Sequence, residues 1–200
     1  FYSEGYFADY PPGYLYVLGA VGVVQKIFGL DFNGAAFKML LALVPAVCDC
    51  AAAWLVAQLG QRCLPDGRGV LCLTAFAAFH PAALFDTAVW KQIDGAFTLP
   101  ILLCFLLLET KNYLPAAIFY GIALSIKPQA LLFGPVLAAC FLAGIVLEQD
   151  RLRAFGRCFA GAALALLPVL AAGLPFFGLR GLLPGLLGKY AGTVSSYPYA

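Results

Sequence analysis

The chain has 200 residues, of which 63% are hydrophobic and only 11% are charged, and its formal net charge is +2. Soluble domains carry about 25% charged residues, so this chain has too few polar groups to cover a water-exposed surface. The composition excludes a cytosolic enzyme, a disordered tail and a disulfide-rich secreted module, and the small net charge excludes a nucleic-acid-binding protein. It predicts an all-α protein that crosses the membrane several times.

The cysteines and the histidine do not form the pattern of a metal or redox centre. The chain has seven cysteines, one histidine (His80) and no C-x-x-C motif. Zinc sites and thiol redox centres need closely spaced ligand pairs of that kind. We therefore expect the cysteines to pack as small apolar residues, predict no metal ligands, and leave open whether a divalent metal is used.

Polar residues divide the apolar sequence into seven segments. A short one covers residues 14–28, and longer ones cover 37–59, 69–86, 95–110, 112–126, 128–147 and 158–177. A bilayer core about 30 Å thick needs about 20 residues of helix. The pattern therefore predicts a transmembrane helical bundle with about six spanning helices.

The short segment 14–28 decides which polar segments share a side of the membrane. If it lies along the membrane interface, three of them face the same side: 1–13, 86–94 and 178–200. The numbers of Lys and Arg do not distinguish this arrangement from a spanning helix, but the compact basic loops at 60–68 and 148–157 are typical of the cytoplasm. Since 15 residues are also few for a span, we predict a juxtamembrane, interfacial helix.

These assignments predict that residues 1–200 form a single transmembrane domain. It would comprise the end of an extracytoplasmic loop with the interfacial helix (1–36), the transmembrane helices (37–177) and a second extracytoplasmic loop (178–200). Because the chain begins with Phe1 and not Met, we expect it to be an internal piece of a longer module and inactive alone.

The first polar cluster precedes the short helix and contains Asp9 and Tyr10. Pro11 and Pro12 follow, and paired prolines fix an extended backbone and are tolerated at a helix start. Asp9 would then project from a rigid corner. The alternative is that Asp9 only caps the helix, and the spacing does not distinguish the two.

The second cluster lies between two apolar segments and contains Asp86, Trp90, Lys91, Gln92 and Asp94. Trp90 can stack on a sugar face, while Gln92 and Asp94 can form hydrogen bonds with hydroxyl groups. The alternative is an interfacial belt in which Asp94 caps the next helix. Because the belt does not explain the density of polar groups, we favour the binding of a hydroxylated or phosphorylated headgroup.

The third cluster, Lys127-Pro128-Gln129, is enclosed by apolar sequence on both sides. A cation there is costly unless it reaches the interface, pairs or binds an anion. Pro128 is expected to break the helix and free backbone groups for a ligand. The alternative is that Lys127 only extends to the interface at a turn.

The fourth cluster is aromatic and polar and lies near the end of the chain. It suits carbohydrate or lipid headgroups but is weakly specific. Its members are Lys189, Tyr190, Ser195, Ser196, Tyr197, Pro198 and Tyr199.

In this order, the four motifs resemble the GT-C superfamily of polyprenyl-phosphate-sugar-dependent glycosyltransferases, especially bacterial relatives of the GPI mannosyltransferase II family. The resemblance covers nearly the whole chain and rests on D-Y-P-P-G-Y at 9–14, W-K-Q-I-D at 90–94, K-P-Q at 127–129 and Y-P-Y-A at 197–200. Lys91 departs from the family pattern, in which Gly is commoner at that position.

The resemblance implies a GT-C-like integral membrane enzyme in a bacterial plasma membrane, with its active site on the extracytoplasmic side. It would transfer a sugar, mannose by this resemblance, from a polyprenyl-phosphate donor to an unidentified acceptor. Its partners would be membrane lipid and the lipid-linked sugar, with no cofactor established. The family's usual catalytic Asp lies upstream of the first motif, hence before Phe1, which leaves Asp9 as a helper or a structural residue. Substrate-binding roles are implied for Tyr10, Trp90, Gln92, Asp94, Lys127, Gln129 and Tyr197.

Two other functions remain compatible with the sequence. A transporter or flippase of lipid-linked sugars would also need intramembrane polar groups and broken helices, although we would expect those groups near the membrane midplane. A non-catalytic membrane subunit would not need four dense polar clusters. We therefore favour the transferase.

Overall fold

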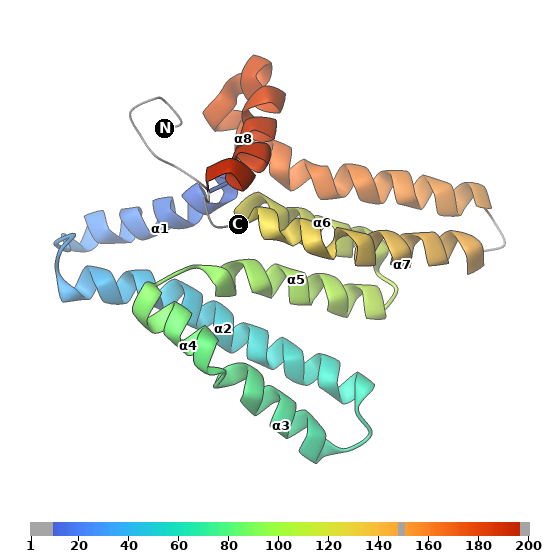
Figure 1. Cartoon of the computed structure of the whole chain (residues 1–200), viewed down its shortest axis with the longest axis horizontal. Helices are drawn as coiled ribbons and strands as arrows, with labels where there is room; N and C mark the ends of the chain where they lie inside the picture. The colour runs from blue at the N-terminus through green and yellow to red at the C-terminus, as the bar shows by residue number, and fades with distance from the viewer. Residues whose placement is uncertain (1–9, 148–150, 197–200) are drawn as a thin grey trace. The chain divides into compact units, whose positions relative to one another are not determined.

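The computed structural model describes residues 10–147 and 151–196, and this part of the chain contains helices and no strands (Figure 1). The all-α prediction is confirmed. The helices are α1 (Pro12–Phe28), α2 (Ala35–Cys63), α3 (Gly67–Ala78), α4 (Pro81–Phe85), the π-helical turn η1 (Asp86–Trp90), α5 (Asp94–Glu109), α6 (Tyr113–Ile126), the 3₁₀ segment η2 (Pro128–Phe133), α7 (Gly134–Leu147) and α8 (Arg151–Ser196).

Each apolar segment of the sequence is helical, although several boundaries differ from the prediction. The basic segment 148–157, predicted as a loop, is helical from Arg151 onward. The segment 69–86 is interrupted at His80, which is extended at φ −60° and ψ 121° because Pro81 disfavours helical geometry in the residue before it. The segment 178–200, predicted as a loop, is helical from just after Gly178 to Ser196. Gly178 has a φ of 63°, so it turns the chain and the helix then resumes.

Within the described residues, three helical stretches are long and apolar enough to cross a membrane: Ala35–Cys63, Gly67–Trp90 and Leu152–Ala191. The other predicted spans are shorter helices. α5 has 16 residues and α6 has 14, which correspond to about 24 and about 21 Å. Many large apolar side chains on α2, α3 and α8 are exposed, as expected where lipid replaces a protein neighbour.

The helices form two compact units. In the α2–α5 unit, α2 packs against α3 and α5 and also contacts η1 (Figure 1). In the α6–α8 unit, which includes the start of α1, α8 packs against α6 and α7.

Small residues bring α6 and α8 close together. Ala116, Ala117 and Ala123 of α6 are fully buried, and a Cβ atom on Gly121 would overlap the backbone carbonyl of Ala165. Such small-residue contacts are the usual way in which membrane helices approach closely. The end of α6, which directly precedes the third polar motif, is thereby fixed against α8.

The second part of α8 folds back onto the first part. A Cβ atom on Gly173 would lie 2.9 Å from Leu182 Cδ1 and 3.0 Å from Leu186 Cδ2, on the far side of the kink at Gly178. This return places Tyr190 beside the end of α6, as described below.

Candidate functional site

The start of α1 packs directly on the end of α6 and so brings the first and third motifs together. A Cβ atom on Gly13 would overlap the backbone carbonyl and the hydroxyl of Ser125. Pro11 and Pro12 beside it are fully buried. Gly13 of the first motif is therefore required for steric reasons, because no side chain fits between these two helix ends.

Lys127 is buried at this junction, with only 5% of its surface exposed. Its Nζ lies 5.6 Å from the centroid of the Tyr10 ring, within the range of a cation–π interaction. The Tyr10 ring in turn lies 4.5 Å from the ring of Tyr14. Two residues that the sequence predicted separately for substrate binding, Tyr10 and Lys127, are thus neighbours.

The helix break predicted at Pro128 is present. α6 ends at Ile126, Lys127 is extended at φ −139° and ψ 135°, and Pro128 begins η2. Proline has no N–H group, so the carbonyl of Leu124 lacks the donor that a continuing helix would supply. The hydroxyl of Tyr190 donates a hydrogen bond to that carbonyl at 2.7 Å.

Tyr190 is a residue of the fourth cluster, and its contact with α6 is one that the sequence alone did not reveal. The available signals were the hydroxyl of Tyr190 and the presence of Pro128, which leaves the Leu124 carbonyl without its helical donor. Gln129, predicted to bind substrate, is exposed on η2. Asp9 and Tyr197 lie outside the described residues, so their predicted roles stay predictions.

The second motif forms a tight connection between α4 and α5. Asp86–Trp90 is a π-helical turn, and Lys91 after it has a left-handed backbone with φ 54°. Glycine adopts this geometry without strain, which gives a physical reason for the Gly that is commoner here in the resembled family. Trp90 is 65% exposed at the end of this turn, and Gln92 is half-buried beyond it.

Asp94 is the first helical residue of α5, and Ile93 occupies the capping position without a side-chain hydrogen bond. The alternative role predicted for Asp94, as the N-terminal cap, is therefore wrong in detail. A carboxylate in the first turn still interacts favourably with the helix dipole.

Two cavities adjoin this motif and share Ala83, Asp86 and Asp94. The first has a volume of about 420 Å³ and includes Trp90. The second has about 250 Å³ and adds the polar side chains of Asp49, Thr87 and Thr98. Carboxylates and hydroxyls beside an exposed indole suit the hydrogen bonds and stacking by which proteins bind sugars.

Asp49 and Thr87 were not among the predicted site residues. The available signal was the position of Asp49 inside an apolar span, where ionisable residues are costly and usually functional. Among the described residues, no three His, Cys, Asp or Glu side chains are grouped so that they could hold a metal ion.

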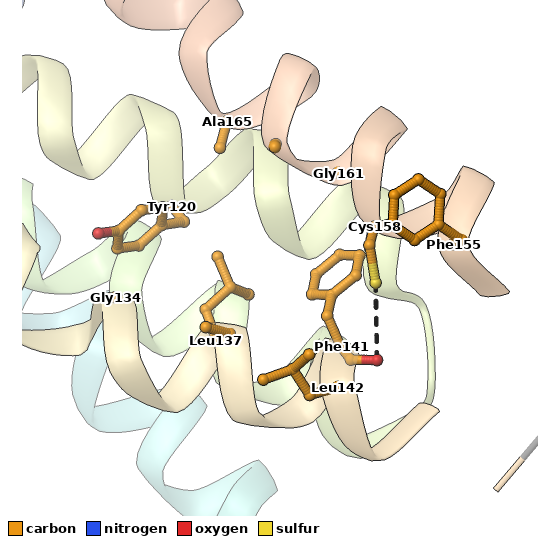
Figure 2. A pocket seen from close by; sticks show the side chains of 11 residues that line it. Tyr120, Gly134, Leu137, Phe141, Leu142, Phe155, Cys158, Gly161 and Ala165 are labelled. Atoms are coloured by element: carbon orange, nitrogen blue, oxygen red, sulfur yellow. Dashed lines mark hydrogen bonds between the residues drawn. The ribbon is translucent and has the colours of Figure 1, made fainter. Parts of the chain in front are cut away.

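The α6–α8 unit contains a separate cavity of about 430 Å³, which is almost entirely apolar (Figure 2). Tyr120 and Gly134 line one end, and Phe155 and Cys158 line the other; Cys158 Sγ lies 3.7 Å from the Phe141 carbonyl oxygen. The remaining lining residues are Leu137, Ala138, Leu142, Gly161, Ala162 and Ala165.

Comparison with known proteins gives one positive result. The model of glycosyltransferase family 87 matches residues 7–195. No curated protein and no solved structure matches the chain. The match supports the predicted glycosyltransferase class, but through family 87 and not through the GPI mannosyltransferase II family.

Proposed function

Because the chain belongs to glycosyltransferase family 87, a family of membrane glycosyltransferases, we propose that it transfers a sugar from a polyprenyl-phosphate donor to an acceptor hydroxyl. The chain is an integral membrane protein, and we place the reaction on the extracytoplasmic side of a bacterial plasma membrane. Mannose is the sugar that the motif resemblance favours. The family match argues against the transporter and the non-catalytic subunit.

In the proposed reaction, the acceptor oxygen forms a bond to the anomeric carbon while the bond from that carbon to the phosphate oxygen breaks. The electron pair leaves with the polyprenyl phosphate, and the hydroxyl proton passes to a carboxylate base. Asp9, next to Tyr10 in the sequence, is the proposed helper to that base. The developing charge on the phosphate requires a nearby cation.

The burial of Lys127 at a helix break is the observation that carries this proposal. It is a buried cation at a helix break, held beside the ring of Tyr10. A positive charge has a stronger effect on a phosphate in such a water-poor site than at a surface. The extended backbone around Lys127 also interrupts the helical hydrogen bonds, which suits a position that approaches a ligand.

The apolar cavity of the same unit supports a lipid donor. Tyr120 at one end of the cavity precedes Lys127 by seven residues, or roughly 10 Å along α6. Gly134 at the same end directly follows η2. A phosphate at Lys127 would therefore have an apolar space nearby for the first isoprene units of its chain (Figure 2).

The proposed test measures donor KM and kcat for the full-length enzyme with lipid-linked mannose. Lys127→Met keeps the apolar stem but removes the charge, and the loss of a charge-assisted hydrogen bond of about 1.5–3 kcal/mol predicts a roughly 10–150-fold weaker constant. Lys127→Arg should retain part of the activity. Lys38→Met, which removes an exposed cation from α2, is the matched control.

Normal constants in Lys127→Met would contradict the phosphate role and leave Lys127 as an interfacial anchor. The product distinguishes the competing function. A transporter would move the lipid-linked sugar across a vesicle membrane without forming a new glycosidic bond.

A further inference from the structure

Asp49 is an ionisable residue at the midpoint of α2, one of the helices long enough to cross the membrane. The residues around it are apolar or small: Val47, Cys48, Cys50 and Ala51. A carboxylate in such a position is costly and marks a functional role more often than a packing role. The transfer reaction proposed above gives Asp49 no role.

The carboxylate of Asp49 holds the π-helical turn η1. Thr87 Oγ1 donates a hydrogen bond to Asp49 Oδ2 at 2.5 Å, and Thr87 is only 9% exposed. Thr87 lies three residues before Trp90 in the same turn. Single π-helical turns are uncommon and occur often at functional sites. The hydrogen bond to Asp49 ties this turn to the neighbouring helix α2.

The same carboxylate also lies against the start of α5. A Cβ atom on Gly95 would overlap it and would lie 2.8 Å from the carbonyl oxygen of Pro45. Gly95 directly follows Asp94. Asp49 therefore contacts the polar segment near both ends, and between them Lys91 has a left-handed backbone that persists only where the surrounding structure fixes it.

We propose that Asp49 is a positioning residue for the transfer reaction, which holds Trp90 and Asp94 in place through the Thr87 hydroxyl and the close contact with Gly95. This inference rests on the proposed function, because it assumes that Trp90 and Asp94 bind a substrate. A role in helix packing alone would lower the amount of folded protein but would leave the KM of the folded fraction unchanged.

The test compares substitutions of Asp49 and Thr87 in the full-length protein. Asp49→Leu and Thr87→Val each remove the hydrogen bond, and we expect a roughly tenfold higher KM for the donor or the acceptor. Asp49→Asn keeps an acceptor oxygen for Thr87 and should stay near wild type. The double variant should be little worse than either single variant, because both remove one interaction.

Thr74→Val is the matched control, since the Thr74 hydroxyl only donates to the carbonyl of Val70 within α3. Amide hydrogen exchange provides a second measurement that does not need activity. In Asp49→Leu, exchange should become faster in residues 86–95 and stay unchanged in residues 116–126 of the other unit.

Unchanged KM in Asp49→Leu, or unchanged exchange in 86–95, would overturn the positioning role. Equal losses in Asp49→Asn and Asp49→Leu would also overturn it, because the charge and not the hydrogen bond would then be required. Lack of transfer by the wild-type protein would overturn the proposed function instead. The exchange measurement would still decide whether Asp49 orders this segment.

Discussion

The hydroxyl of Tyr190 is expected to stabilise the helix break that holds Lys127. Tyr190→Phe removes that hydroxyl and keeps the ring. The Leu124 carbonyl would then lose its donor from Tyr190, and Pro128 has no N–H group to replace it. Leu124 is 8% exposed, so water can replace the lost donor only poorly.

The expected loss of stability equals the penalty for leaving a buried carbonyl without a hydrogen-bond partner. That penalty is about 1–3 kcal/mol in the free energy of unfolding. Pro128→Ala supplies a background in which the Tyr190 hydroxyl is less needed, because alanine restores an N–H group at the position that would bond to Leu124 in a continuing helix. In that background, Tyr190→Phe should cost less, and the difference should lie within the coupling of about 0.5–3 kcal/mol typical of interacting residues.

The assay is reversible denaturant unfolding of the full-length protein in detergent, with donor KM measured in parallel. Tyr16→Phe is the matched control, since its hydroxyl donates to the Ala172 carbonyl at 3.3 Å from an exposed position. We expect Tyr16→Phe to change stability by less than about 0.5 kcal/mol. The reasoning is refuted if Tyr190→Phe costs no more than Tyr16→Phe, or if it costs the same with and without Pro128.

Two other predictions concern the first motif and the orientation in the membrane. Gly13→Ala should destabilise the protein by about 1–3 kcal/mol in denaturant unfolding, because its methyl group would overlap Ser125. Gly19→Ala is the control and should be neutral or stabilising, because a Cβ atom there meets open space in α1. Equal effects of the two substitutions would contradict the steric argument. In a cysteine-free background, Val89→Cys, at a position 56% exposed, should react with an impermeant thiol reagent in intact cells, while Gly67→Cys should react only after permeabilisation. The reverse pattern would invert the proposed topology.

The sequence predicted the helices well because their signal is local. Runs of apolar residues between polar ones set the positions of α1, α2 and α6, and Pro128 marked the break after α6. The kink at Gly178 and the helix after it were missed, because Gly- and Pro-containing sequence is compatible with either a loop or a broken helix.

The site was only partly predictable because its contacts join residues that are distant in sequence. The motifs identified Tyr10, Trp90, Asp94 and Lys127, but no pattern places Tyr10 against Lys127. Asp49 lay 38 positions from Thr87 and within a segment that was assigned to the membrane by its apolar composition. Hydropathy averages over a window, so it hides a single charged residue that matters for chemistry.

The return of α8 at Gly178 also limits how this chain can change in length. As one straight helix, the 46 residues of α8 would extend about 69 Å, more than twice the hydrocarbon thickness of a bilayer. Because α8 folds back at Gly178, Tyr190 reaches the Leu124 carbonyl only if the number of residues between Gly178 and Tyr190 stays the same. One inserted residue in that stretch would rotate Tyr190 by about 100° around the helix axis and shift it by about 1.5 Å, away from the Leu124 carbonyl. Insertions and deletions in homologues should therefore be rare between these two residues.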